Sequence, residues 1–160
     1  MLDLFANADY VGQAKALEVF KKIFSGCTVQ YEQHYDDKSP IDIYVTATTK
    51  NGKVSTYAVE CKDRYFEHTS FSTPYKDTPA GWVMDTPKYN NMVKAAEKGY
   101  KPIYFNSFKD DTYVIWDAIK SPHTYGKYKA GKTTVVESEK IDKEGYFYQV
   151  KDCIYSGKTN

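Results

Sequence analysis

Two runs of alternating apolar and polar residues, separated by Asn51-Gly52, constrain the fold of this chain most strongly. Alternation with a period of two is typical of a strand that buries one face, and Asn-Gly between two such runs is a strong hairpin signal. We therefore predict a β-hairpin over about residues 41–61. The apolar positions are Ile41, Ile43 and Val45 in the first run and Tyr57, Val59 and Cys61 in the second.

The segments on either side of the hairpin have different patterns. Before it, apolar residues recur every three or four positions from Asp9 to Ser25, which predicts a helix that ends at Gly26. Residues 28–32 are consistent with a short strand. After the hairpin, residues 63–85 are irregular, and a connection of this length is typical of a lid, a binding loop or a disordered segment.

A second helix is predicted over residues 86–99. Thr86 is the expected N-cap, Pro87 the first helical residue and Gly99 the end of the helix. Residues rich in β-branched and aromatic side chains indicate further strands. These are predicted over residues 103–106, 112–116 and, at a sheet edge, 145–150.

The predicted order α-β-β-β-α-β-β indicates an α/β fold, with a mixed central sheet flanked by helices. The chain has 160 residues, of which 41% are hydrophobic, and this size and composition fit a single domain. We expect residues 1–160 to form one unit, with its core in residues 9–117 and a polar, lysine-rich extension over residues 118–160.

Composition also limits the expected location and partners. No apolar run approaches the roughly 20 residues that cross a bilayer, so no membrane partner is expected. The first five residues lack the basic region of a signal peptide, which favours a cytoplasmic protein. Three widely spaced cysteines fit no disulfide framework. The formal net charge is +1, so any nucleic-acid surface must come from local clusters of lysine.

Three polar residues in the hairpin point to chemistry. Glu60 and Lys62 are two apart on a strand, so both side chains project from the same face. Asp42 lies between two isoleucines in the opposing run. A carboxylate in such a position is costly to desolvate unless it is paired or binds a metal. The three residues therefore suggest a metal ligand set beside a lysine that handles protons.

This arrangement resembles the PD-(D/E)xK nuclease superfamily, which includes many restriction endonucleases and Holliday-junction resolvases. The resemblance covers residues 9–117 in the superfamily's αβββαβ order, a restriction-endonuclease-like core. Asp42 matches the aspartate of the motif, Glu60 its central acid and Lys62 its lysine, and Pro40 stands two residues before Asp42.

The resemblance implies a metal-dependent endonuclease that hydrolyses phosphodiester bonds in DNA, with branched DNA as one candidate substrate and RNA as an alternative. Asp42, Glu60 and the backbone carbonyl of Cys61 would hold Mg²⁺ or Mn²⁺, since such oxygen donors suit hard cations. Lys62 would orient or deprotonate the attacking water. Glu18 on the first helix corresponds to an additional metal ligand in resolvase-like members.

Several lysines are candidates for contacts with the DNA backbone. Lys88 would begin the second helix near the cleft, and Lys127 and Lys129 alternate with tyrosines as in a strand-stacking groove. Cutting both strands of a duplex usually requires two active sites, so a homodimer is a further expectation.

Other interpretations of these residues remain open. Glu18 and Lys22 form a favourable i,i+4 helix pair, and Glu60 and Lys62 would also suit ion pairs on an exposed sheet face. At the level of the whole protein, the alternatives are a catalytically silent nucleic-acid-binding module and an α/β protein-interaction domain.

The turn at Asn51-Gly52 decides whether the acids can meet. A two-residue loop places Asp42 opposite Cys61 and away from Glu60. A three-residue loop, Lys50-Asn51-Gly52, with Gly52 in the left-handed conformation, places Asp42 opposite Glu60. Because a one-residue slip turns every side chain to the other face, only one register permits the site. We predict the three-residue loop, or an equivalent offset of one residue further along the hairpin, with Ile41, Ile43, Val59 and Cys61 on the face opposite the acids.

Overall fold

The computed structural model describes residues 4–34, 39–72, 77–131 and 140–160, which form two sheets and two α-helices. The larger sheet has six strands in the order β1-β2-β3-β5-β6-β9. Strands β3 and β5 run parallel and the other neighbouring pairs are antiparallel, so the sheet is mixed, as predicted. Its strands are β1 (Thr28–Gln33), β2 (Ile43–Thr48), β3 (Val54–Asp63), β5 (Lys101–Ser107), β6 (Thr112–Asp117) and β9 (Tyr155–Lys158).

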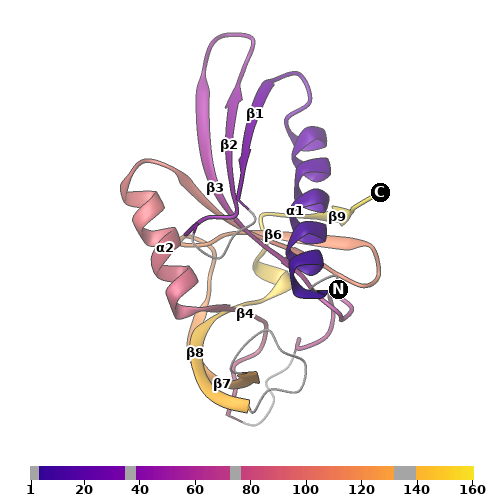
Figure 1. Ribbon diagram of the computed structural model, residues 1–160, viewed down its shortest axis with the longest axis vertical. Helices are drawn as coiled ribbons and strands as arrows, with labels where there is room; N and C mark the ends of the chain where they lie inside the picture. Colours follow the sequence, from indigo (N-terminus) through magenta and orange to yellow (C-terminus); the bar gives the residue numbers. More distant parts are fainter. Residues whose placement is uncertain (1–3, 35–38, 73–76, 132–139) are drawn as a thin grey trace.

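Helices α1 (Leu4–Ile23) and α2 (Thr86–Glu97) flank the larger sheet (Figure 1). Side chains of α1 pack against Val59 and Cys61 of β3, whereas side chains of α2 belong to a second cluster that includes Ala58. Because side chains alternate along a strand, the two helices cover opposite faces of β3. The α/β arrangement is therefore confirmed. Within the described ranges, neither α-helix is long and apolar enough to span a membrane.

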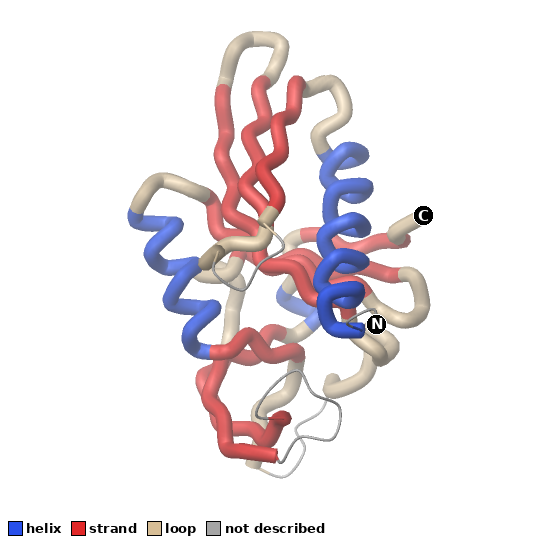
Figure 2. The backbone as a smooth tube through the Cα atoms, viewed as in Figure 1, coloured by secondary structure: helices blue, strands red, loops and turns tan. Residues whose placement is uncertain are grey.

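A smaller antiparallel sheet lies below α2 in the view of Figure 2. It consists of β4 (Trp82–Asp85), β8 (Lys140–Tyr148) and β7 (Thr124–Gly131), with β8 in the middle. The prediction of an edge strand over residues 145–150 is wrong, because most of that segment is the end of a central strand. Local sequence did not indicate its two neighbours, since β4 lies in the irregular segment and β7 is polar.

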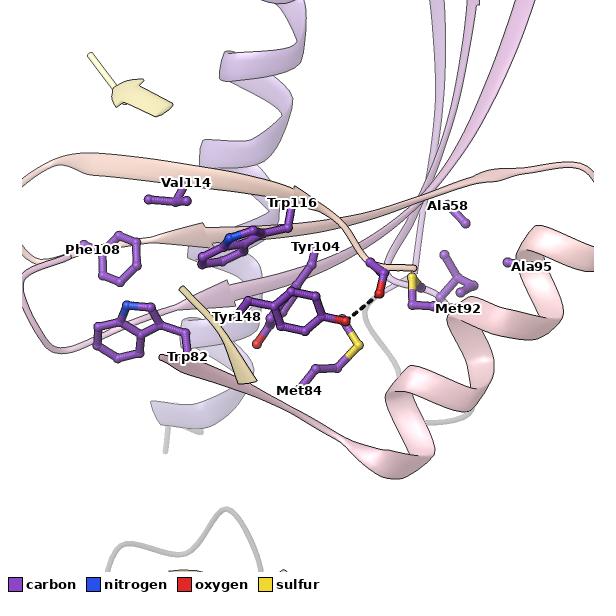
Figure 3. Close-up of a cluster of buried hydrophobic side chains, with 12 residues drawn as sticks. Ala58, Trp82, Met84, Met92, Ala95, Tyr104, Phe108, Val114, Trp116 and Tyr148 are labelled. Carbon is purple, nitrogen blue, oxygen red and sulfur yellow. Dashed lines mark hydrogen bonds between the residues drawn. The ribbon is translucent and has the colours of Figure 1, made fainter. Parts of the chain in front are cut away.

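The lysine-rich extension contributes to the main core. The Tyr148 ring packs against Tyr104 and Trp116, with ring centroids 5.3 and 5.6 Å away. Its hydroxyl donates a hydrogen bond to the Ala118 carbonyl at 2.6 Å (Figure 3). Tyr148 and Ala118 are fully buried. The core thus extends beyond residues 9–117, and β8 joins the two sheets. A single 3₁₀ turn, Val150–Asp152, leads towards β9.

The start of α2 differs from the prediction by one residue. Asp85 is the N-cap, Thr86 is the first helical residue and Pro87 the second. The Thr86 hydroxyl donates to the Glu144 carbonyl at 3.0 Å, so it ties the helix to β8 instead of capping it. Helix α1 begins at Leu4, earlier than the predicted start.

Candidate functional site

The turn of the hairpin is the three-residue loop Lys50-Asn51-Gly52 that the sequence predicts. The Thr49 N–H donates to the Lys53 carbonyl and the Gly52 N–H donates to the Thr49 carbonyl, both at 2.9 Å. Gly52 has a φ of 83°, in the left-handed region that glycine adopts at little cost. The two-residue alternative is excluded, because it requires a different pairing.

This turn fixes a register that brings the two predicted acids together. Ile43 stands opposite Val59, so the next positions outward are Asp42 and Glu60. The Asp42 Oδ2 accepts a hydrogen bond from the Cys61 N–H at 2.9 Å. The charge of Asp42 also raises the pKa of the Glu60 carboxyl. The register and the hydrogen bond to Cys61 place Asp42 beside Glu60 at the open end of the hairpin.

Glu60 and Lys62 project from the face of β3 that α2 covers. Their neighbours Val59 and Cys61 are packed under α1, on the other face. From the α2 side, the Lys88 Nζ lies 3.2 Å from the Glu60 Oε1. Lys62 is exposed at the edge of this group, and its charge lowers the Glu60 pKa.

One part of the predicted pattern is wrong. Ile41 is expected on the same side as Val59, yet it packs with Ala58 in the cluster under α2. The chain bends at Asp42, before β2 begins, so strict alternation does not extend back to Ile41. At this bend the Asp42 carboxylate accepts the hydrogen bond from the Cys61 N–H of β3.

The electrostatics of Glu60 are unusual for a glutamate. The residue is only 7% exposed, and its Oε2 atom is buried without a hydrogen-bond partner among the described residues. Burial, and next the charge of Asp42, raise the pKa of Glu60 to about 8, against the lowering effect of Lys88 and Lys62. A buried carboxylate that costs this much to ionise is a feature of functional sites.

The structure does not bring Glu18 to these groups. Helix α1 covers the opposite face of β3, and the Glu18 side chain is 62% exposed and accepts a hydrogen bond from Lys21 at 3.2 Å. Glu18 therefore pairs with Lys21 and not with Lys22, the partner that the helix spacing suggested. Glu18 is not part of this site.

The three lysines predicted to contact DNA lie in two places. Lys88 is at the start of α2 and pairs with Glu60. Lys127 and Lys129 are exposed on β7 of the smaller sheet, where the Lys129 Nζ lies 4.0 Å from Asp142. Lys88 therefore lies beside Glu60, and the other two lysines lie on a different surface.

Sequence reasoning missed Arg64, which continues the same face of the chain after Glu60 and Lys62. Its Nη2 donates to the Tyr104 hydroxyl at 2.6 Å and to the Val83 carbonyl at 2.8 Å. Its Nε donates to Asn106 at 2.6 Å. Arg64 is the only arginine in the chain, and this is the feature of the sequence that could have drawn attention to it.

The donors at the hairpin end suit a hard divalent cation. Asp42 and Glu60 supply carboxylate oxygens, the Cys61 carbonyl is adjacent in the chain, and the unpartnered Glu60 Oε2 has the capacity to accept a ligand bond. No group of three or more Asp, Glu, His or Cys side chains suited to a metal occurs in the described part of the chain. Mg²⁺ fits this small set, because it is commonly held by one or two carboxylates and retains several waters.

Comparison with protein-family models, with curated proteins and with solved structures finds no match for this chain.

Proposed function

We propose that this chain is a metal-dependent nuclease of the PD-(D/E)xK type that hydrolyses phosphodiester bonds in DNA. The observation that carries the proposal is the position of Asp42 beside a buried Glu60 with an unpartnered oxygen, and Lys62 on the same face two residues further. An α/β protein has little structural reason to bury a glutamate beside a second carboxylate, because desolvation of the glutamate and repulsion between the two acids oppose folding.

Asp42 and Glu60, with the Cys61 carbonyl, would hold a Mg²⁺ or Mn²⁺ ion. When bound, such an ion polarises the scissile phosphate and lowers the pKa of a bound water. Glu60 ionises more readily beside a cation, since the desolvation and repulsion that raise its pKa are then offset.

The lysines have separate roles in this proposal. Lys62 is exposed, and its charge lowers the pKa of Glu60. In this proposal it orients the attacking water and offsets the charge that develops on the phosphate. Lys88 lies 3.2 Å from Glu60 and lowers its pKa, against the burial that keeps the carboxyl protonated in the metal-free protein. Near a bound substrate, the same ammonium would be within reach of a backbone phosphate.

The test is cleavage of supercoiled, linear, branched and single-stranded DNA with Mg²⁺ or Mn²⁺. Asp42→Asn and Glu60→Gln should abolish both cleavage and divalent binding measured by calorimetry. Lys62→Met should abolish cleavage and leave divalent binding largely intact, because an ammonium is not a metal ligand. Metal-dependent cleavage that persists in the Glu60 variant contradicts the proposal.

Two matched controls separate the site from general effects of charge. Glu18→Gln repeats the acid-to-amide change on the opposite face of the sheet, and should leave binding and cleavage unchanged. Lys53→Met repeats the lysine change at the exposed turn end of the same hairpin.

The ion pair between Lys88 and Glu60 favours a second candidate, a catalytically silent nucleic-acid-binding module. In such a protein the ammonium of Lys88 would substitute for a metal permanently. Binding of DNA without divalent binding or cleavage, in both the parent chain and Lys88→Met, identifies this case.

A further inference from the structure

A cavity of about 690 Å³ lies between the segment that follows β3 and the smaller sheet. We call it the aromatic cavity. Its volume is in the range of pockets that enclose small ligands, about 300–1,000 Å³. The residues that matter for its chemistry are Arg64, Phe66, Phe71, Trp82, Lys127 and Lys129.

Two partly exposed phenylalanine rings pack against a buried tryptophan in this cavity. Phe66 and Phe71 are 49% and 46% exposed, and their ring centroids are 5.3 Å apart. Each packs against Trp82, at 6.0 and 5.0 Å, and Trp82 packs against Phe108 at the edge of the core (Figure 3). The exposed rings are thus held in place by the core beneath them and still present about half of their surface to a ligand.

The backbone holds one of these rings in a costly conformation. Phe71 has a φ of 58°, in the left-handed region that bulky residues rarely adopt. The Gly81 N–H donates to the Phe71 carbonyl at 2.8 Å and closes the segment. Strain of this kind persists where the surroundings enforce it, and it clusters at ligand-binding positions.

The charges around the cavity favour an anionic ligand. Lys127 and Lys129 line it from β7, and the Arg64 guanidinium carbon lies 5.2 Å from the centroid of the Trp82 ring. Asp77 and Asp142 also line it, so among the described lining residues three cations accompany two acids, a net of +1. Aromatic rings together with cations are the features that bind single-stranded nucleic acid, through base stacking and phosphate contacts.

The cavity is connected to the acidic site through β3 and β5. Arg64 lies four residues after Glu60, which corresponds to about 13 Å along an extended chain. Arg64 donates to the hydroxyl of Tyr104, the residue that pairs with Glu60 across the two strands. The hydrogen bonds of Arg64 therefore link the wall of the aromatic cavity to the pair of strands that carries Glu60.

We propose that the aromatic cavity binds an unpaired base of a single-stranded nucleic acid, stacked on Phe66 and Phe71, with neighbouring phosphates at Lys127 and Lys129. The choice of a nucleic acid as the ligand rests on the proposed nuclease function. Under this proposal, the preferred substrate contains a single-stranded or splayed segment, and an intact duplex lacks the base that the cavity takes.

Binding is measured without cleavage, by fluorescence anisotropy in EDTA. The first probe is a labelled single-stranded thymidine oligonucleotide of about 12 nucleotides, a length within the roughly 4–16 that one single-strand-binding OB fold covers. The other two probes are its duplex with a complementary strand and an abasic strand of equal length. The parent protein should bind the single strand more tightly than the duplex and the abasic strand.

The Phe66→Ala and Phe71→Ala double variant should weaken binding of the single strand by at least about fivefold, the lower end of the contribution of one stacked base. Its binding of the duplex should change little. Tyr155→Ala is the matched control, because this ring is 54% exposed on β9, away from the cavity. A second variant, Lys127→Met with Lys129→Met, should flatten the dependence of affinity on salt. Far-ultraviolet circular dichroism checks that each variant is folded.

Several results overturn the proposal. The first is that the double variant binds the single strand as tightly as the parent does. The second is that the parent binds the abasic strand as tightly as the thymidine strand. The third is that the parent fails to bind the single strand. The last result leaves a peptide or a small apolar ligand as the occupant. Because binding is measured without metal, these outcomes are independent of cleavage. If the protein cleaves DNA and the double variant binds the single strand normally, only the proposal for the cavity is refuted. If binding depends on the two rings and no cleavage occurs, only the proposed nuclease function is refuted.

Discussion

Replacing Glu60 with glutamine should remove a pH dependence from the stability of the metal-free protein. Burial and the nearby charge of Asp42 raise the pKa of the Glu60 carboxyl from 4.5 to about 8. Between these two values the folded protein holds a proton that the unfolded chain has released. The contribution to stability is therefore complete below the unfolded-state pKa and is lost as the pH rises through the folded-state pKa. Glutamine does not titrate, so the variant should lack this loss.

The size of the effect follows from the difference between the two pKa values. About 3.5 pH units, at about 1.36 kcal/mol each, correspond to about 5 kcal/mol in total. About 4 kcal/mol of this falls between about pH 5 and about pH 9. The Glu60 side chain is only 10% exposed, so solvent screening reduces the value little. The loss is large for a domain whose free energy of unfolding is typically about 5–15 kcal/mol.

The assay is urea denaturation in EDTA at a series of pH values, for the parent chain, Glu60→Gln and Glu18→Gln. The free energy of unfolding of Glu60→Gln should exceed that of the parent by an amount that grows with pH. Glu18→Gln should follow the parent, because its carboxylate is 62% exposed and its charge is screened. Parallel curves for the parent and Glu60→Gln would refute the argument that Glu60 is a buried acid beside Asp42.

Three further predictions concern the parts of the fold that position the site, all measured by urea denaturation. Tyr148→Phe should cost about 1–3 kcal/mol, because the buried Ala118 carbonyl loses its donor; an unchanged midpoint contradicts this. Gly145→Ala should destabilise by about 1–3 kcal/mol, since a Cβ there would lie 2.5 Å from the Met84 carbonyl oxygen and would push β4 from β8; a neutral result means that the two strands can separate freely. Gly52→Ala should cost about 1–2 kcal/mol from backbone strain alone, because nothing lies within 4 Å of the added atom; a stabilised variant would mean that the turn does not need the left-handed conformation.

The hairpin shows how much local sequence can determine. Alternation and the Asn51-Gly52 signal predict both strands, and the requirement that Asp42 face Glu60 selects the three-residue loop that the structure contains. Turn chemistry and strand periodicity act over a few residues, so both can be read from the chain. The same reasoning failed at Ile41, where a bend interrupts the alternation.

Long-range contacts account for the parts that sequence reasoning missed. The position of Lys88 against Glu60 joins an α2 residue to a strand 28 positions earlier, and depends on how the helix packs on the sheet. Arg64 finds its acceptors on β4 and β5, and β8 becomes a central strand only because β4 and β7 flank it. Local sequence did not encode these pairings.

The sequence by itself therefore determined the hairpin and the three residues Asp42, Glu60 and Lys62 at its open end, whereas the register followed only from the added requirement that Asp42 face Glu60. Only the tertiary structure decided that Glu60 is buried, that Lys88 rather than Glu18 is its neighbour, and that an aromatic cavity lies further along the same face. The physical reason is that periodicity and turn preferences are properties of neighbouring residues, whereas burial, and the pKa values that depend on it, are set by which distant segments pack together.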